Sequence, residues 1–320
     1  MSRWYYQCPS GHHYFPWDAT QELRGRYSKT VAQTMCRLSG RLDFRAAADE
    51  LKRQGIDVSH TTLEQTTEEW GTEVDVSRWV SSQPLEERQR WYVICDGCHT
   101  HSPDGWHEVK VGTVYRDYTQ YGEKSEPHAI EESVRYVATR APAEEFGQKW
   151  NAIATKSGGY PEGEENAEIV PIGDGAPWSW NLVDDYFPTA VEIVDYPHPP
   201  LNLGTGAKTA FGEHNETQVS QWVKITENQL FLGNIQQVTQ RIRQLGEAYP
   251  PHQEELNAQA ADFEKHPHPM QYQTFPEKGY HIGSGIVQSA CKHVGAEMCK
   301  QAGMKWKNTG SDAILSWRCI

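Results

Sequence analysis

The sequence lacks long hydrophobic runs, has few cysteines and carries a deficit of basic residues. No stretch of its 320 residues stays apolar for long enough to cross a bilayer, and we find no signal peptide. The seven cysteines are scattered and odd in number, which argues against a secreted disulfide framework and favours a reducing cytoplasm. The formal net charge of -13 argues against a protein that coats nucleic acid nonspecifically, but leaves room for local basic surfaces.

Positive charge gathers in the C-terminal part of the chain. From Lys278 onward there are six basic residues against two acidic ones. Gly283-Ser284-Gly285 precedes a helical pattern, and a Ser/Gly turn at a helix N-terminus offers backbone N–H groups to a phosphate. Lys292 shares a helix face with Gln288, four residues earlier. We therefore expect Ser284, Lys292 and Lys305 to contact an anionic partner.

The stretch 167–181, AEIVPIGDGAPWSWN, is the most informative in the chain. An apolar strand ends at Asp174, which lies between two glycines, and a Trp-rich helical pattern follows. A carboxylate at the end of a buried strand can hold a divalent metal, and the glycines leave room for a ligand. The alternative is an aspartate that caps the loop between strand and helix. A second apolar strand, 91–95, is followed in the same way by Asp96.

The central pattern alternates between strands and helices. Strands are expected at 91–95, 107–115 and 133–139, then a helix, the Asp174 strand, another helix, and a strand at 190–194 before Asp195. This is the order of an α/β, ribonuclease-H-like mixed sheet, in which the first and fourth strands are neighbours. Asp96 and Asp174 would then emerge side by side. Two adjacent carboxylates repel each other, and bridging divalent cations stabilise them, as in two-metal phosphoryl transfer.

A compact helical pattern precedes the sheet. Ser28, Asp43 and Ser59 are placed to cap three successive helices, a layout typical of a helix-turn-helix. The exposed start of the third helix, Ser59 to Thr62 with His60 and Thr61 between them, would enter a major groove of DNA. A helical packing or dimerisation domain is an equally weighted alternative.

Two cysteine motifs suggest metal sites only weakly. Cys8 with His12 or His13 could form half of a zinc knuckle, but no second pair lies nearby, so we expect an aromatic arm and no zinc. Cys95 and Cys98 have CxxC spacing without a partner pair, and Cys95 should face the core.

Three blocks together resemble the ISKra4-type insertion-sequence transposases of the DDE group: GDGAPWSWN, Asp195-x-x-His198, and IGSGIVQSACK followed by GMKW. The resemblance spans nearly the whole chain. It implies a ribonuclease-H-like enzyme that cuts double-stranded DNA at transposon ends with Mg²⁺ (or Mn²⁺) and joins the 3′ ends to a target. The family's first two catalytic acids fall on Asp96 and Asp174, with Asp195 and His198 as secondary site residues. It also implies a homodimer in a prokaryotic cytoplasm, associated with the nucleoid and not with a membrane.

The chain departs from this family at two places near the site. The third family acid, a glutamate, falls on Gln288, which is neutral and a poorer metal ligand. Glu297 lies nine residues further on and would point to the opposite face of the helix. After Asp195 the sequence is YPHPPLNL, whose prolines predict a disrupted helix start.

These patterns predict five segments and leave two main functions open. The segments are an aromatic arm with the remnant of a zinc-ribbon-like segment (1–18), a helix-turn-helix-like domain (19–82), a ribonuclease-H-like core (90–196), a helical insertion (197–279) and the rest of the core with the third catalytic position (280–320). One function is a DDE transposase impaired by Gln288. The other is a cleavage-defective, transposase-derived DNA-binding protein. A non-transposing ribonuclease-H-like nuclease is a third, weaker alternative.

Overall fold

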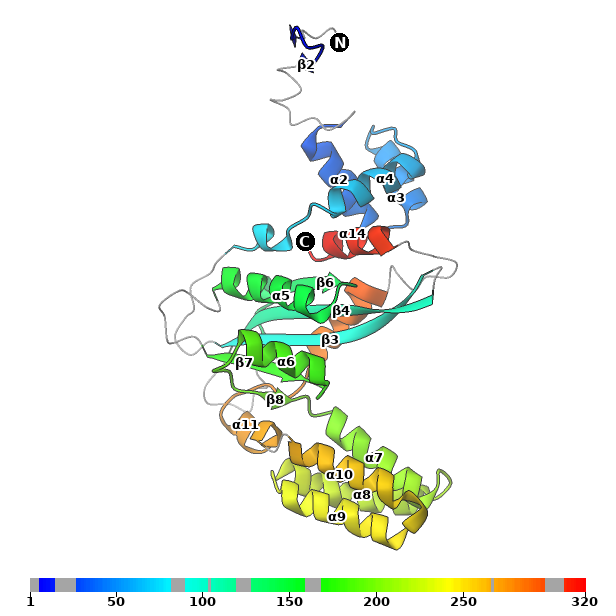
Figure 1. The fold of residues 1–320 in the computed structure, drawn as a ribbon, viewed down its shortest axis with the longest axis vertical. Coiled ribbons are helices and arrows are strands. Elements are labelled where there is room, and N and C mark those ends of the chain that lie inside the picture. The colour runs from blue at the N-terminus through cyan, green and yellow to red at the C-terminus, as the bar shows by residue number, and fades with distance from the viewer. Residues whose placement is uncertain are drawn as a thin grey trace.

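The computed structural model describes residues 6–14, 27–81, 90–102, 105–118, 128–158, 168–265, 268–296 and 308–320. A mixed sheet with helices on both faces occupies the middle of the molecule (Figure 1). A three-helix unit and the last helix lie toward one end, and a group of longer helices forms the other. No helix within the described ranges is long and apolar enough to cross a bilayer.

The N-terminal segment forms a small antiparallel hairpin where the sequence suggested an aromatic arm. Strands β1 (Tyr6–Gln7) and β2 (His13–Tyr14) pair. Gly11 allows the tight turn between them, because its φ of 86° is a conformation that other residues rarely adopt. Cys8 lies exposed in this turn.

The three-helix unit begins each helix at its expected cap. The Ser28 side chain accepts from Val31 N, that of Asp43 from the first turn of its helix, and that of Ser59 from Thr62 N. The helices enclose a small apolar core, and their bounds are α2 (Lys29–Ser39), α3 (Phe44–Arg53) and α4 (His60–Gly71), followed by the 3-10 turn η1 (Val76–Trp79).

This unit packs on the last helix, α14 (Asn308–Arg318). Gly71 makes the close approach possible, because a Cβ there would lie 2.6 Å from the Cα of Ala313. Arg318 donates from Nη1 to the carbonyl of Gly40. On its other side, α14 is fixed to the sheet by Asp312, whose Oδ1 accepts from the backbone of Arg140 at 2.8 Å. The helical unit is therefore held to the sheet through α14.

The central sheet has the expected strand order and directions. β4 lies between β3 and β6 and is antiparallel to both, while β7 is parallel to β3 and β8 is parallel to β7. This α/β arrangement is compatible with a ribonuclease-H-like sheet. The strands are β3 (Trp91–Ser102), β4 (Gly105–Tyr118), β5 (His128–Ala129), β6 (Arg135–Thr139), β7 (Ile169–Gly173) and β8 (Ile193–Val194), with the 3-10 turn η2 (Glu131–Ser133) before β6.

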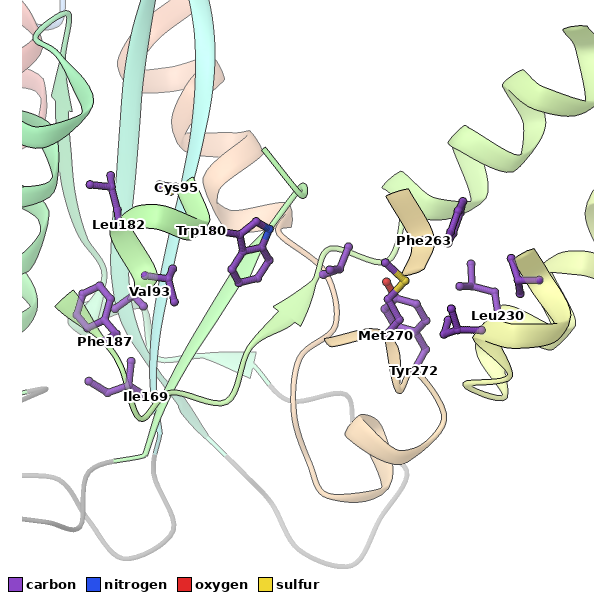
Figure 2. Packing of buried hydrophobic residues seen from close by; sticks show 14 of the residues in the cluster. Val93, Cys95, Ile169, Trp180, Leu182, Phe187, Leu230, Phe263, Met270 and Tyr272 are labelled. Carbon is purple, nitrogen blue, oxygen red and sulfur yellow. The ribbon is translucent and has the colours of Figure 1, made fainter. Parts of the chain in front are cut away.

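Alternating side chains of β3 pack on opposite faces of the sheet. Trp91, Val93 and Cys95 belong to the cluster that includes helices α5 (Ala143–Ser157) and α6 (Pro177–Tyr186). Figure 2 shows Val93 near Leu182 and Phe187 of this cluster. The intervening residues of β3, Tyr92 and Ile94, belong to the cluster on the opposite face, which includes α12 (Gly285–Ala290) and α14. The prediction that Cys95 faces the core is confirmed.

A group of helices is inserted between β8 and α12. The prolines after Asp195 do not disrupt the first of them, as the sequence suggested, because Pro199 and Pro200 fall in the first turn, where no intrahelical N–H bond is lost. Leu230, Phe263, Met270 and Tyr272 pack together there (Figure 2). The bounds are α7 (His198–Phe211), α8 (Glu216–Phe231), α9 (Ile235–Ala248), α10 (Gln253–Lys265) and α11 (Thr274–Glu277), with 3-10 turns η3 (Pro250–His252) and η4 (His268–Met270).

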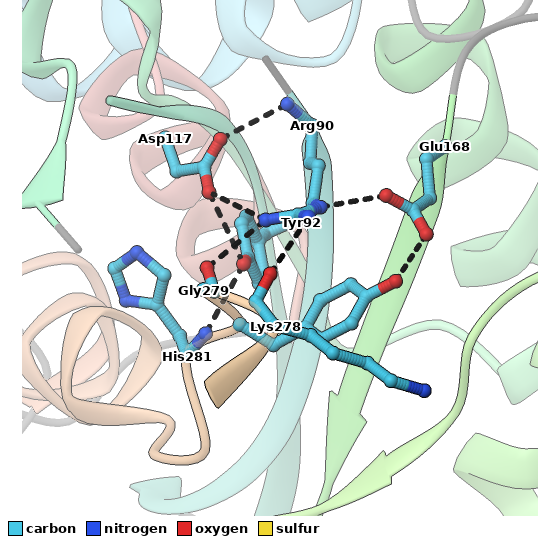
Figure 3. A network of polar contacts seen from close by, with 8 residues as sticks. Arg90, Tyr92, Asp117, Glu168, Lys278, Gly279 and His281 are labelled. Carbon is cyan, nitrogen blue, oxygen red and sulfur yellow. Dashed lines mark hydrogen bonds and ion pairs between the residues drawn. The ribbon is translucent and has the colours of Figure 1, made fainter. Parts of the chain in front are cut away.

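Arg90, immediately before β3, fastens the chain that returns from this insertion (Figure 3). Its Nε donates to Glu168 Oε2 at 2.6 Å, and Asp117 Oδ2 lies 3.9 Å from Nη1. The same guanidinium donates to the carbonyls of Lys278 and Gly279 at 2.9 and 3.0 Å. One partly buried cation therefore joins β4 and the residues just before β3 and β7 to the segment that leads into α12.

Tyr92 adds a second link at the same place. Its hydroxyl donates to Asp117 Oδ2 at 3.3 Å and accepts from the backbone N–H of His281 at 3.1 Å (Figure 3). Burial, and the charge of Asp117, raise the pKa of the Tyr92 hydroxyl, so it stays protonated and can donate. This network sets where α12 begins relative to the sheet.

Candidate functional site

Asp96 lies within β3 and not at its end. The sequence Asp96-Gly97 suggested a stop, but β3 continues to Ser102 because β4 pairs with it along its whole length. Parallel pairing with β7 ends earlier, at Ile94 opposite Ile172. Asp96 therefore emerges where β3 extends beyond the shorter neighbouring strand, which places its carboxylate at the open end of the parallel part of the sheet.

Asp174 follows the last residue of β7 and is exposed. Its Oδ1 accepts from the backbone N–H of Ala176 at 2.9 Å, so it also fulfils the loop-capping role that the sequence left open. Gly175, with a φ of 95°, makes the turn. One carboxylate oxygen is used by the loop, and the other remains to serve a ligand.

Asp96 and Asp174 influence each other electrostatically. Burial raises the pKa of Asp96, and the negative charge of Asp174 raises it further. A hydrogen bond from Gly97 N to Asp96 Oδ1, at 2.7 Å, acts in the opposite direction. The predicted carboxylate pair is thus close enough for the charge of one to be felt by the other.

Asp195 lies at the centre of a hydrogen-bonded cluster. Its side chain is completely buried, with 0% exposed. Oδ1 accepts from the backbone N–H of Ser284 at 2.8 Å, and Oδ2 accepts from the Ser284 hydroxyl at 2.5 Å. Ser284, which the sequence suggested for a DNA phosphate, therefore gives both of its donors to Asp195. This corrects that expectation: the Ser/Gly turn fastens α12 to the end of β8.

His198 joins the cluster from the first turn of α7. Its Nε2 lies 3.3 Å from Asp195 Oδ2, and its side chain is 40% exposed. Its charge lowers the pKa of Asp96, in opposition to burial, so the ring also lies near that carboxylate. Asp195, His198 and Asp96 therefore lie in one neighbourhood, and the secondary role that the resemblance implies for Asp195 and His198 stays a prediction.

Gln288 lies on α12 and takes part in the same cluster. Its Nε2 donates to Ser284 Oγ at 3.2 Å. Since the Ser284 hydroxyl gives its proton to Asp195, its oxygen can only accept from residue 288. A glutamine amide meets this requirement, whereas an ionised glutamate does not. The neutral side chain at this position is therefore matched to its surroundings.

The Cys291 thiol is a site residue that the sequence reasoning did not single out. Its Sγ lies 3.8 Å from Asp96 Oδ2. The hydrogen bond with Cys98, followed by burial and the charge of Asp96, raises the pKa of Cys291, so it stays a thiol. A π-helical turn, Cys291–Ala296, starts at this residue. The sequence feature that could have identified Cys291 is its position three residues after Gln288, which places both residues on the same helical face.

The residues expected to contact DNA are scattered. Ser59 caps α4, and its hydroxyl lies 2.8 Å from that of Thr62 in the first turn, while His60 and Thr61 are exposed beside them. Lys292 is exposed in the π-helical turn Cys291–Ala296, whose second residue it is. Lys305 lies outside the described residues.

The outer face of α4 is acidic. Glu64 and Glu69 are exposed on it, and the helix sequence contains neither lysine nor arginine. DNA phosphates would be repelled along most of this helix. Contacts with DNA would have to come from its first turn, where the helix dipole is positive.

The carboxylates of the site form a pair and not a larger cluster. Within the described ranges, no group of three or more His, Cys, Asp or Glu side chains is arranged to hold a metal ion. Asp96 and Asp174 form the pair, and α12 brings the neutral amide of Gln288 to Ser284. The exposed Cys8 contacts Ser10 Oγ at 2.7 Å through its Sγ.

Comparisons with known proteins add little to this geometry. No family model matches the chain, and no curated protein matches it. Among solved structures, the chain is similar to the Drosophila P element transposase strand transfer complex, with 13% identity, a TM-score of 0.34, and coverage of 92% of this chain and 79% of that one. A TM-score this low does not establish a shared fold. The fold therefore rests on the strand order and directions above.

Proposed function

We propose that this chain is a DDE-type transposase of the ISKra4 kind whose cleavage activity is weakened at the third acidic position, Gln288. The observation that supports this most strongly is that Asp96 and Asp174 both follow the end of parallel pairing between β3 and β7, where the charge of Asp174 raises the pKa of Asp96. Gln288 enters the adjoining Asp195 cluster from α12. The sheet order is the one in which such carboxylates serve phosphoryl transfer.

Mg²⁺, or Mn²⁺, is the ion that the carboxylate pair fits. Magnesium keeps several waters and is often held by one or two carboxylates together with substrate phosphates. The repulsion that adds to the raised pKa of Asp96 would be relieved by a cation shared with Asp174. When bound, the ion would polarise a phosphodiester and make a bound water more acidic.

The chain's own residues would position the DNA and handle the proton. Asp195 fixes the ring of His198 through Nε2, which leaves Nδ1 to hold or deliver a proton at the site. Lys292, exposed one turn beyond Gln288, would contact a phosphate. The core at 90–196 and 280–320 would act on DNA, with the domain at 19–82 recognising double-stranded ends through His60 and Thr61. A homodimer would pair the two ends, in a prokaryotic cytoplasm.

One observation favours a second candidate, a transposase-derived DNA-binding protein that does not cleave. The amide of Gln288 satisfies an acceptor, Ser284 Oγ, that an ionised glutamate would leave unmet. The local structure is thus adapted to the neutral residue. Such a protein would keep end recognition and lose strand cleavage.

DNA cleavage separates these candidates. The substrate is a supercoiled plasmid carrying the DNA that flanks the coding sequence, incubated with Mg²⁺ or Mn²⁺ and scored for nicks and strand-transfer products. The transposase proposal predicts slow cleavage by the wild type, at least tenfold faster cleavage by Gln288→Glu, and none by Asp174→Ala. Specific binding of the flanking DNA, with no cleavage by either the wild type or Gln288→Glu, would favour the second candidate. Cleavage by Asp174→Ala at the wild-type rate would refute the site.

A further inference from the structure

A cavity of about 470 Å³ lies between the three-helix unit and the core, away from the carboxylate pair. Helix α2, strand β6, helix α12 with its π-helical turn, and helix α14 all contribute to its wall. The lining side chains used below are Arg37, Arg41, Ser289, His293, Trp317 and Arg318.

The cavity wall is basic although the protein is acidic overall. Three arginines and one histidine line it, and none of its lining side chains is acidic. This contrasts with the chain's formal net charge of -13. Arg37 and Arg41 are exposed on the side of the three-helix unit, and His293 is exposed on the side of the core. The field inside the cavity therefore favours an anion.

Trp317 adds a nearly buried aromatic side chain to the cavity wall, with the residue 5% exposed. Its indole Nε1 is buried and has no hydrogen-bond partner within the described part of the chain. Because solvent does not reach this nitrogen, a ligand in the cavity does not reach it either, and recognition of an anion falls to the arginines.

Arg318 is held in place by backbone carbonyls. Its Nε donates to Val294 O at 3.0 Å, and its terminal nitrogens donate to Gly40 and His293. The Arg318 guanidinium is thereby fixed at the cavity wall. Its charge adds to the positive potential in the cavity, but the side chain does not move to contact a ligand. Arg37 is steadied in turn against the ring of Trp79, with its Cζ 5.4 Å from the ring centroid.

We propose that this cavity binds a backbone phosphate of DNA, as a second contact outside the carboxylate site. This rests on the proposed function. A phosphate supplies the negative charge that the arginines favour and acceptor oxygens for the N–H groups of Arg37 and Arg41. Ser289 and His293 reach the cavity from the same helical segment that carries Gln288 and Cys291. A phosphate bound here links the three-helix unit to the segment that completes the carboxylate site.

The test is binding of a short fluorescent DNA duplex to the full chain, with EDTA present so that cleavage plays no part, over a series of salt concentrations. Arg41→Gln is expected to weaken binding about tenfold and to reduce the salt slope by about one, since one phosphate contact is lost. Arg37→Gln removes the second exposed arginine of the cavity and should weaken binding to a similar extent, with a similar change in the salt slope. The charge-matched control is Arg243→Gln, an exposed arginine of α9 that pairs with Glu264.

The results distinguish phosphate binding in the cavity from DNA binding by the chain as a whole. If the wild type binds duplex but Arg37→Gln and Arg41→Gln weaken binding no more than Arg243→Gln does, the cavity is refuted while DNA binding stands. If the wild type binds no duplex, the proposed function itself fails, and the inference with it. Inorganic phosphate or a mononucleotide serves as the second probe. If either raises the thermal midpoint of the wild type but not that of Arg41→Gln, and duplex does not compete for it, a free phosphate compound is the ligand and DNA is refuted. Thermal unfolding of Arg37→Gln and Arg41→Gln confirms that each variant is folded before it is compared.

Discussion

Ser284 donates both its backbone N–H and its hydroxyl to the two oxygens of Asp195, at 2.8 and 2.5 Å. These residues are 89 positions apart, and their contact brings α12 against the end of β8. The remaining acceptor capacity of the Ser284 hydroxyl is taken by the Gln288 amide. A buried aspartate therefore determines, through Ser284, where Gln288 lies.

Ser284→Ala should destabilise the fold. It removes the hydroxyl donor from a completely buried carboxylate and the acceptor from Gln288, so we expect a loss of about 1.5–3 kcal/mol in the free energy of unfolding. Urea denaturation measures it. Ser289→Ala, an exposed serine on the same helix, should change stability by less than about 0.5 kcal/mol. Equal effects of the two variants would contradict the role assigned to Ser284.

Asp96 should make the stability of the metal-free protein fall as the pH rises. The folded state binds this proton more tightly than the unfolded state, so the free energy of unfolding falls as the pH rises from the ordinary pKa of 3.8 through the raised folded value. Asp96→Asn removes this pH-dependent decrease in the free energy of unfolding, because asparagine does not titrate. In EDTA, its thermal midpoint should exceed that of the wild type at neutral pH, and the two should converge as the pH approaches 3.8.

The matched control for this pH series is Asp184→Asn, which neutralises an exposed carboxylate on α6. It should show no pH-dependent gain. If Asp96→Asn is less stable than the wild type at every pH, Asp96 is not held in the unfavourable environment described here.

Gln288→Glu should lower stability in the absence of metal and recover it when metal is added. An ionised carboxylate cannot donate to Ser284 Oγ and adds a negative charge beside Asp195, at a cost of up to about 1 kcal/mol for this exposed side chain. Mn²⁺ should raise the thermal midpoint of the variant more than that of the wild type, because ligand binding to the native state stabilises it. A variant as stable as the wild type in EDTA would show that the amide contributes nothing.

The junction between the three-helix unit and α14 depends on Gly71. Gly71→Ala places a methyl group against the backbone of Ala313, and overpacking of this kind costs about 1–3 kcal/mol. Gly204→Ala, in α7, meets no atom within 4 Å and should be neutral or stabilising, because alanine is the better helix former. Chemical denaturation compares the two. A neutral Gly71→Ala would mean that the unit is loosely docked.

The sequence predicted the sheet because apolar alternation and strand-to-helix order are local signals. The helix caps at Ser28, Asp43 and Ser59 were predictable for the same reason. The extent of β3 was not, because Asp96-Gly97 resembles a strand end and only pairing with β4 carries the strand further.

Contacts between distant parts of the chain explain the remaining differences. Ser284 resembled a phosphate site because its partner, Asp195, lies far away in the sequence. The contact between Cys291 and Asp96 was missed for the same reason, since it spans 195 positions. The assignment of Asp96 and Asp174 to catalysis stays a prediction.

The central claim is that Asp96 and Asp174 together hold a divalent cation, and Mn²⁺ binding followed by electron paramagnetic resonance tests it most directly. We expect the wild type to bind one ion at this site. We expect Asp96→Asn and Asp174→Asn each to weaken binding at least tenfold, and Asp184→Asn to leave it unchanged. Wild-type binding no tighter than that of Asp96→Asn and Asp174→Asn would contradict the account.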